Sequence, residues 1–223
     1  FTDLKSAMIA TDPAVVVVAT PTEKHLESVR EIFAFGRPLA LLCEKPLAYD
    51  FQDAQQIVEL CERNNCALYI NFFRRAEPGL LSISKLLDKF DHPKSFQGVV
   101  WYSKGIFNSG SHFIDLLCFL FGDVQNVKVI KPGCTSLDPE PDVKLCFNGG
   151  DIYLLAAGVK NFFHNSLELI TPNGRLRYDD GGSLIYWQDA KEDLKIPKKY
   201  RLSNDYKYLE NDLFRCQAYV VEL

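Results

Sequence analysis

The stretch Val15-Val16-Val17-Val18-Ala19-Thr20-Pro21 decides the fold class of this chain. Four consecutive valines without polar alternation are typical of a parallel β-strand that is covered on both faces. Thr20-Pro21 ends the run, and residues 23–35 then carry apolar side chains at helical spacing up to Gly36, a natural helix stop. The stretch therefore predicts the first strand and crossover helix of an α/β sheet.

The same strand-to-helix step is repeated further along the chain. Residues 39–43 form a second apolar run, residues 50–63 a helix that Asp50 can cap, and residues 67–70 a third run. Strands that alternate with helices at this spacing are joined by right-handed crossovers into a parallel sheet. We therefore expect an α/β domain over residues 1–73.

A different pattern begins near residues 71–75. Short apolar runs are separated by Pro, Gly and Asn turns, which is typical of antiparallel hairpins. The expected strands cover residues 95–103, 124–130, 143–147, 152–157, 167–171, 175–178 and 184–187, and the expected helices cover residues 78–90, 108–121 and 205–223. We therefore predict a second domain, residues 74–223, of the α+β class with a largely antiparallel open sheet.

Composition narrows the class of protein and its location. The 223 residues carry a net charge of −4, so no positive excess is available for a nucleic-acid partner. No apolar run reaches the roughly 18 residues of a membrane span, so we expect no membrane partner. The seven cysteines include no Cys-x-x-Cys pair and mostly lie in apolar runs, where a thiol behaves as a small hydrophobe. We expect structural thiols and a cytoplasmic protein.

Three polar segments follow the carboxyl ends of the predicted parallel strands, at residues 19–22, 44–46 and 71–75. Ligands bind at this edge of open parallel sheets, so the three segments indicate one binding site. An alternative is that Thr20 and Thr22 only cap the following helix, a role that is compatible with ligand contact.

Lys45 is the most informative of these residues, because it ends a buried strand beside Glu44 and Pro46. Partial burial there favours the neutral amine, whereas Glu44 favours the charged form. Such a lysine can give and take a proton during a reaction. The alternative is a solvated lysine at a strand end.

Asn108, His112 and Asp115 lie four and three residues apart, which places them on one face of an otherwise apolar helix. A polar stripe on a buried helix needs hydrogen-bond partners or a wet cavity. His112 could hold or relay a proton near neutral pH, or it could be a core histidine paired with Asp115. No third ligand is near in sequence, so we expect no metal site.

Three further residues are candidates for ligand binding. Arg74 and Arg75 could hold an anionic substrate group through bidentate contacts, or they could form surface salt bridges. His25, in the first turn of its predicted helix, could contact a ligand or lie on the surface.

These motifs together resemble the glucose–fructose oxidoreductase and inositol dehydrogenase family (Gfo/Idh/MocA) over about residues 1–122. The resemblance implies a Rossmann domain, here partial, followed by a domain with an open sheet. It also implies an NAD(P)-dependent oxidoreductase that transfers a hydride to or from a hydroxyl or keto carbon of a sugar, sugar nucleotide or polyol. The motifs that carry it are the valine strand with Thr20-Pro21 and His25, then Glu44-Lys45-Pro46, then Asn71 with Arg74-Arg75, and finally Gly110-x-His112-x-x-Asp115.

The resemblance also implies roles for individual residues. Lys45 would touch both the cofactor, NAD or NADP, and the reacting hydroxyl, and His112 would assist proton transfer or bind substrate, with Asn108 beside it in the catalytic set. The expected cofactor contacts are Ala19, Thr20, Pro21, His25, Glu44, Lys45, Pro46 and Asn71. The expected substrate contacts are Arg74, Arg75, Asn108 and Asp115.

The chain departs from the family pattern in two places. Asn108 stands where the family usually has an aspartate. Because an amide cannot share a proton, Lys45 and His112 would carry out the proton transfer. No G-x-G-x-x-G motif occurs. The family's first two strands should precede Phe1, and we expect that this amino-terminal segment is missing from the sequence, because an unprotected central sheet edge is a liability. The alternative is a protein that has lost half of its dinucleotide site.

Two other classes of function stay open. One is a non-catalytic relative that senses a sugar or dinucleotide, and the other is a scaffold whose main surface forms a homo-oligomer. We expect a homodimer or homotetramer joined through the outer sheet face of the second domain, because apolar stretches such as residues 152–157 leave that face uncovered.

Overall fold

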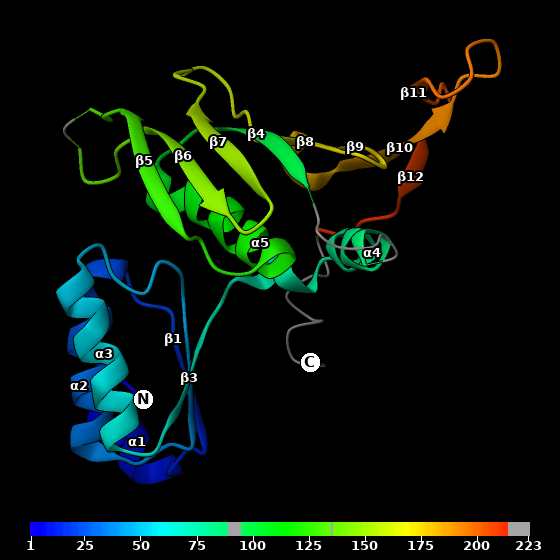
Figure 1. Ribbon diagram of the computed structural model, residues 1–223. Helices are drawn as coiled ribbons and strands as arrows, with labels where there is room; N and C mark the ends of the chain where they lie inside the picture. The colour runs from blue at the N-terminus through cyan, green and yellow to red at the C-terminus, as the bar shows by residue number, and fades with distance from the viewer. Residues whose placement is uncertain (89–94, 135, 214–223) are drawn as a thin grey trace. The chain divides into compact units, whose positions relative to one another are not determined.

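The computed structural model of the protein describes residues 1–88, 95–134 and 136–213. The chain divides into two compact units, Phe1–Phe72 (unit 1) and Phe73–Leu223 (unit 2). In Figure 1, unit 1 runs from blue to cyan and unit 2 continues to the red end of the chain. The domains predicted from the sequence meet at residues 73 and 74.

Unit 1 is a three-stranded parallel sheet with helices packed on one face (Figure 1). The strand order is β1-β2-β3. The strands are β1 (Val15–Val18), β2 (Ala40–Cys43) and β3 (Ala67–Ile70), and the helices are α1 (Leu4–Thr11), the short 3-10 helix η1 (Thr22–Lys24), α2 (His25–Phe35) and α3 (Phe51–Arg63). This is the alternation of strands and helices that the sequence predicts.

Side-chain caps explain where two of these helices begin. The Asp50 carboxylate accepts hydrogen bonds from the backbone N–H groups of Gln52 and Asp53 and so caps α3. Asp3 caps α1 in the same way through the N–H of Ser6. The core forms where the helices meet the sheet, and its buried members are Met8, Val18, Val29, Ile32, Phe33, Leu41, Cys43, Ile57, Cys61 and Cys66.

The prediction that the valine strand is covered on both faces is wrong. Val18 is 3% exposed on the helix side, whereas Val15 and Val17 are 60% and 59% exposed on the other side. Tyr69, which lies in register with Val17 through the central strand, is 61% exposed. Side chains alternate across a strand, so a continuous apolar run places residues on both faces whether or not both are covered.

Unit 2 is built on a nine-stranded open sheet in the order β11-β10-β9-β8-β4-β7-β6-β5, with β12 paired to β10. Neighbouring strands run antiparallel except β4 and β7, which are parallel. The strands are β4 (Phe96–Tyr102), β5 (Asn126–Lys131), β6 (Asp142–Phe147), β7 (Gly150–Ala156), β8 (Ser166–Thr171), β9 (Gly174–Asp179), β10 (Leu184–Glu192), β11 (Tyr200–Leu202) and β12 (Lys207–Leu209). The sheet is therefore largely antiparallel, as predicted.

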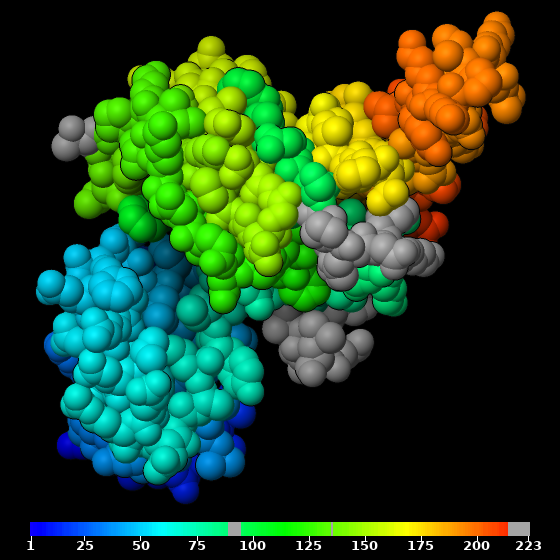
Figure 2. All heavy atoms as spheres, viewed as in Figure 1, coloured from blue at the N-terminus to red at the C-terminus, as the bar shows by residue number. Residues whose placement is uncertain are grey.

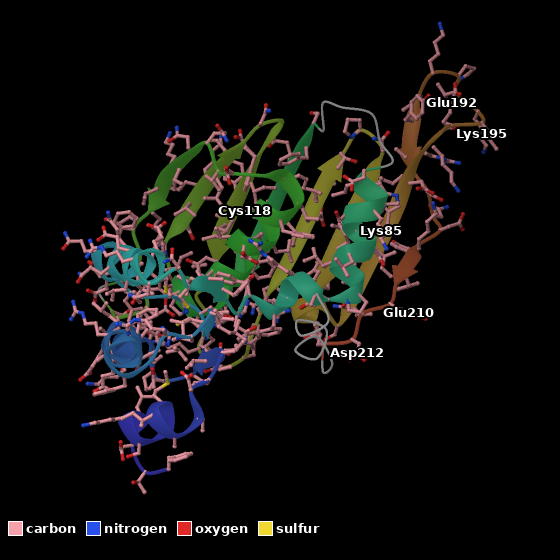
Figure 3. The ribbon with its side chains drawn as sticks, turned by 90° about the horizontal axis from the view of Figure 1, so that it is seen from below. Lys85, Cys118, Glu192, Lys195, Glu210 and Asp212 are labelled. Carbon is pink, nitrogen blue, oxygen red and sulfur yellow. The ribbon has the colours of Figure 1, made fainter. Side chains whose placement is uncertain are left out.

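Two helices, α4 (Pro78–Leu87) and α5 (Ser111–Phe121), cover one face of this sheet. Figure 3 shows both helices in front of the strands, with Lys85 on α4 and Cys118 on α5 labelled. Alternate strand residues such as Val100 on β4 point toward these helices and are fully buried. Two short 3-10 segments, η2 (Phe73–Ala76) and η4 (Asp180–Gly182), complete the unit.

Unit 2 differs from the predicted elements in three places. The helix predicted from residue 205 is wrong within the described chain, because Lys207–Leu209 is the strand β12. Residues 214–223 of that prediction lie outside the described residues. Strand β11 was not predicted, and the helix predicted over residues 108–121 begins as a π-helix, η3 (Ile106–Gly110), before it continues as α5.

The hairpin of β10 and β11 extends beyond the rest of the sheet of unit 2. Figure 2 shows its atoms, in orange, standing clear of the neighbouring strands, and Figure 3 labels Glu192 and Lys195 at its end. Residues 190–192 of β10 pair with residues 200–202 of β11. None of these residues is among the buried core residues of the described chain, so this outer part of the hairpin adds nothing to the core.

Candidate functional site

The candidate site residues fall into two groups, one at the strand ends of unit 1 and one around a cavity of unit 2. In unit 1, His25 is 1% exposed, and its ring lies between two backbone carbonyl groups. Nδ1 is 3.0 Å from the oxygen of Leu47, and Nε2 is 2.9 Å from the oxygen of Thr20. The alternative of a surface histidine is therefore wrong, because His25 ties the loop after β1 to the loop after β2.

Glu44 and Asn71 connect the next pair of strand ends. The Asn71 Nδ2 donates a hydrogen bond of 2.7 Å to Glu44 Oε1, which links the ends of β2 and β3. The Oδ1 of Asn71 is buried and has no hydrogen-bond partner among the described residues. A buried acceptor in this state is suited to a ligand that brings a hydrogen-bond donor.

Lys45 lies in the loop that these contacts hold. It is half-buried, and its peptide bond to Pro46 is cis. Ala19, Thr20 and Pro21 are exposed at the end of the neighbouring strand. The structure therefore gathers the predicted cofactor contacts at the carboxyl edge of the unit 1 sheet: Ala19, Thr20, Pro21, His25, Glu44, Lys45, Pro46 and Asn71.

Unit 2 contains a cavity of about 130 Å³ at the start of α5. Asn108 on η3 and His112 on α5 both line it. The His112 ring packs edge-on against Phe73, with ring centres 5.3 Å apart. Two of the three residues of the predicted polar stripe, Asn108 and His112, therefore face a cavity. The other lining residues are Arg74, Ser109, Phe113, Leu116, Phe163, Asn165, Tyr178 and Gly181.

A distant loop places Asn108 at this cavity by holding the first turn of η3. The Asp138 carboxylate accepts hydrogen bonds from the backbone N–H groups of Phe107, at 2.7 Å, and Asn108, at 3.0 Å. Glu140 Oε1 accepts another, of 3.1 Å, from the N–H of Gly105. Backbone N–H groups at a helix start need such acceptors. Asp138 therefore caps η3 from the loop between β5 and β6.

Arg74, predicted to bind substrate, lines the cavity and is held by a buried polar cluster. Its Nη1 is 2.6 Å from Glu77 Oε1 and 2.8 Å from the hydroxyl of Tyr178. Tyr178 in turn donates a hydrogen bond of 2.9 Å to Glu77, which is fully buried. Burial raises the pKa of the Tyr178 hydroxyl, with an opposing effect from Arg74, so the hydroxyl keeps its proton and remains a donor.

Arg75 and Asp115, also predicted to bind substrate, bind each other. Arg75 Nε is 2.9 Å from Asp115 Oδ2, and Nη2 is 2.6 Å from Oδ1, which is a bidentate ion pair. Asp115 is 8% exposed, and neither residue lines the cavity. The Asp115 carboxylate is therefore paired with Arg75.

The described residues hold neither a metal cluster nor a reactive thiol in the core of unit 1. In residues 1–88, 95–134 and 136–213, no group of three or more His, Cys, Asp or Glu is placed to hold a metal ion. No helix in that part of the chain is long and apolar enough to cross a membrane. Burial raises the pKa of the Cys43 thiol to about 12 and that of Cys61 to about 11, so both stay protonated and serve as core residues.

Sequence reasoning missed three residues of this site: Asp138, Asn165 and Tyr178. Strand alternation could have placed Tyr178 inside, since it follows the buried Leu176 by two positions on β9. Its contact with Arg74 joins residues 104 positions apart, which no local pattern reveals. Asp138 lies between two strands in a segment without periodicity, and only its contacts show its role.

Comparison with known proteins adds a sequence match in unit 1. Residues 1–72 match the profile of the family described as "Oxidoreductase family, NAD-binding Rossmann fold" (GFO_IDH_MocA). The chain is also similar to the inositol 2-dehydrogenase of Streptomyces avermitilis, with 28% identity over 156 residues, covering 62% of this chain and 44% of that protein. The chain thus spans less than half the length of the curated relatives that it matches.

Solved structures share the fold. The UDP-N-acetylglucosamine 3-dehydrogenase GnnA from Acidithiobacillus ferrooxidans has a TM-score of 0.75 at 16% identity, over 100% of this chain and 72% of that chain. The WlbA dehydrogenase from Bordetella pertussis, solved with NADH and UDP-GlcNAcA, has a TM-score of 0.67 at 20% identity, over 84% of this chain and 67% of that chain. Residues 1–72 thus match the Gfo/Idh/MocA oxidoreductase family in sequence, and the chain shares its fold with these two dehydrogenases.

Proposed function

We propose that the protein is an NAD(P)-dependent oxidoreductase that moves a hydride between a nicotinamide cofactor and a hydroxyl or keto carbon of a sugar, sugar nucleotide or polyol. The observation that carries this proposal is the cavity of unit 2, where His112 and Asn108 face the same space as Arg74. Small-molecule sites are concave and use a few polar groups to fix orientation. The family match over residues 1–72 and the dehydrogenases among the relatives support redox chemistry.

Unit 1 supplies residues that fit the nicotinamide half of the cofactor. The buried Asn71 Oδ1, which lacks a partner among the described residues, can accept a hydrogen bond from a ligand hydroxyl or amide. Thr20 and Pro21 are exposed at the same strand-end edge, with Lys45 half-buried there. The cofactor, NAD or NADP, supplies or accepts the hydride when bound. The WlbA structure with NADH supports this class of cofactor.

Three side chains of this chain would act on the substrate. Lys45 takes the hydroxyl proton on its Nζ during oxidation and returns it during reduction. His112 orients the substrate and can pass the proton onward. Asn108 donates or accepts a hydrogen bond but transfers no proton, because it is an amide.

A turnover assay on the full-length protein tests this function. The protein is mixed with NAD⁺ or NADP⁺ and with panels of sugars, sugar nucleotides and polyols, while the absorbance of reduced nicotinamide is followed. We expect reduction with at least one compound and its loss in Lys45→Met. Lys85→Met is the matched control, because Lys85 is exposed on α4 and has no proposed role in catalysis or binding. A panel without any reduction overturns the proposal.

The second candidate is a non-catalytic relative that senses a sugar or dinucleotide. Asn108 favours it, because an amide replaces the carboxylate that the family usually has at this position. This candidate predicts heat of ligand binding in calorimetry and no turnover with the same compounds. Turnover that depends on Lys45 excludes it.

The assembly and location of the protein are part of the same proposal. Trp101 and Ile170 are 42% and 45% exposed on the outer face of the unit 2 sheet, and they line a shallow hollow there. An exposed apolar patch on a sheet often marks an interface, and a symmetric homodimer or homotetramer would cover it. The described cysteines are free thiols, which supports a place in the reducing cytoplasm.

A further inference from the structure

Two neighbouring arginines, Arg74 and Arg75, use different edges of the guanidinium group. Arg75 holds Asp115 through its Nε–Nη2 edge, with N–O distances of 2.9 and 2.6 Å. Arg74 instead donates from Nη1 to a buried cluster that includes Glu77. Within the described part of the chain, the Nε and Nη2 atoms of Arg74 make no hydrogen bond. The edge with which Arg75 grips a carboxylate is therefore unused in Arg74.

The surrounding cluster holds this unused edge in place. Glu77 is fully buried, and its Oε2 accepts hydrogen bonds of 2.9 Å from Tyr178 and 3.0 Å from Asn211. The Arg74 side chain is 20% exposed and lines the unit 2 cavity. Because these contacts already fix the guanidinium group, a ligand that binds it costs little further loss of side-chain freedom.

The cavity suits a single negative charge. No Asp or Glu is among its described lining residues, and Glu77, the carboxylate beside Arg74, is already paired with Arg74 and Tyr178. Asn108 and Asn165 add neutral polar groups to the wall. The charge of Arg74 is already balanced by Glu77, and no second Lys or Arg is among the described lining residues. A phosphate monoester, with up to two charges, would therefore lack a second cation.

We propose that the Nε–Nη2 edge of Arg74 binds the carboxylate of an acidic substrate, so that the protein acts on a hydroxy acid or on an acidic sugar such as a uronate. The planar pair of carboxylate oxygens matches the guanidinium fork. This inference rests on the proposed function, which it narrows from sugars and polyols in general to carboxylated ones. Arg74 then selects the substrate by its charge.

The first part of the test uses the unmodified full-length protein and matched pairs of ligands. Lactate, gluconate and glucuronate are each titrated in a calorimeter beside the corresponding amide, which has a similar shape and no charge. We expect at least one acid to bind about tenfold more tightly than its amide, because charge-assisted hydrogen bonds are stronger than neutral ones. Equal affinity of acid and amide in all three pairs overturns the proposal. So does Arg74-dependent binding of glucose 6-phosphate that is tighter than that of glucuronate.

The second part assigns the charge preference to Arg74. Arg74→Lys keeps a positive charge beside Glu77 but loses the planar fork, and we expect the acid–amide difference to disappear. Arg63→Lys makes the same change at an exposed ion pair with Glu59 on α3 and should keep the difference. A difference that persists in folded Arg74→Lys contradicts the assignment. If Arg74→Lys does not fold, the ligand pairs on the unmodified protein still decide.

These titrations separate this inference from the proposed function, because they need no turnover. Turnover of neutral sugars together with equal binding of acids and amides overturns this inference alone. Preferential binding of an acid without any nicotinamide reduction overturns the proposed function alone.

Discussion

The sheets of the two units distribute apolar residues in different ways. In unit 1, β1 is apolar at consecutive positions, yet Val18 is 3% exposed and Val17 59% exposed. In unit 2, β6 alternates, so that Val143 is buried while Lys144 on the opposite face forms an ion pair of 2.6 Å with Asp151. Alternation therefore predicts which face is covered, whereas a continuous apolar run predicts the strand and leaves its second face undecided.

The largest expected effect tests whether the strand-end edge of unit 1 carries the proton transfer. Lys45→Ala in the full-length protein should lower kcat by about 10²-fold or more, the usual scale for the loss of a general acid–base group. Cofactor affinity, measured by titration with the reduced nicotinamide, should change much less. Lys85→Ala in unit 2 is the control and should leave kcat as it was. Near-normal turnover of Lys45→Ala contradicts the division of roles between the units.

The next prediction compares a buried and an exposed leucine of unit 1 directly. Leu41 is fully buried in β2, and Leu39, just before that strand, is 70% exposed. Leu41→Ala should lower the free energy of unfolding by about 2–5 kcal/mol, because it leaves a cavity in the core. Leu39→Ala, the same chemical change, should stay within about 0.5 kcal/mol. Urea unfolding of both variants measures the difference, and a large loss at Leu39 would show that this side chain is covered in solution.

A smaller effect is expected at the cavity of unit 2. His112→Ala should reduce kcat/KM by about tenfold, because His112 lines the cavity and is proposed to orient the substrate. The free energy of unfolding should change by less than about 1 kcal/mol. His164→Ala, at an exposed position of the same unit, controls for the loss of an imidazole. If His112→Ala instead loses several kcal/mol of stability with little change in kcat/KM, the residue is structural.

The smallest expected change concerns the outer face of the unit 2 sheet. Ile170→Lys places a charge among the exposed apolar residues and should weaken self-association, because a buried unpaired charge is costly. Light scattering at micromolar protein should show an oligomer for the unmodified full-length protein and a lower molar mass for the variant. Leu194→Lys, at a position 97% exposed in the turn after β10, is the control. A monomer mass for the unmodified protein rules this interface out.

Much of the fold could be predicted because it rests on short-range patterns. The β1 strand, the α3 helix with its Asp50 cap and the alternating strands of unit 2 all follow from residues within one element. The exposure of Val17 could not be predicted, because it depends on which elements cover the sheet. The sequence pattern predicts a helix at residues 207–209, yet they form β12, whose partner β10 lies about twenty positions earlier in the chain.

For the candidate site too, short motifs could be predicted from the sequence and long-range contacts could not. The clusters around Lys45 and His112 stand out as short motifs, and the structure places His112 and Asn108 at one cavity. The different use of Arg74 and Arg75 could not be predicted, because adjacent arginines look equivalent in a sequence. Their partners decide it, and Asp115 lies 40 positions from Arg75.

Asp138 fixes η3 by hydrogen bonds from a separate loop, so the position of Asn108 in the cavity wall does not depend on the core packing of α5. Asn108 is presented by a turn whose N–H groups are satisfied by the β5–β6 connection, not by α5. A change in the length or sequence of that connection can therefore move the wall while the packing of α5 on the sheet stays the same. Exchange of this loop between relatives offers a route to retune substrate preference without repacking the interior.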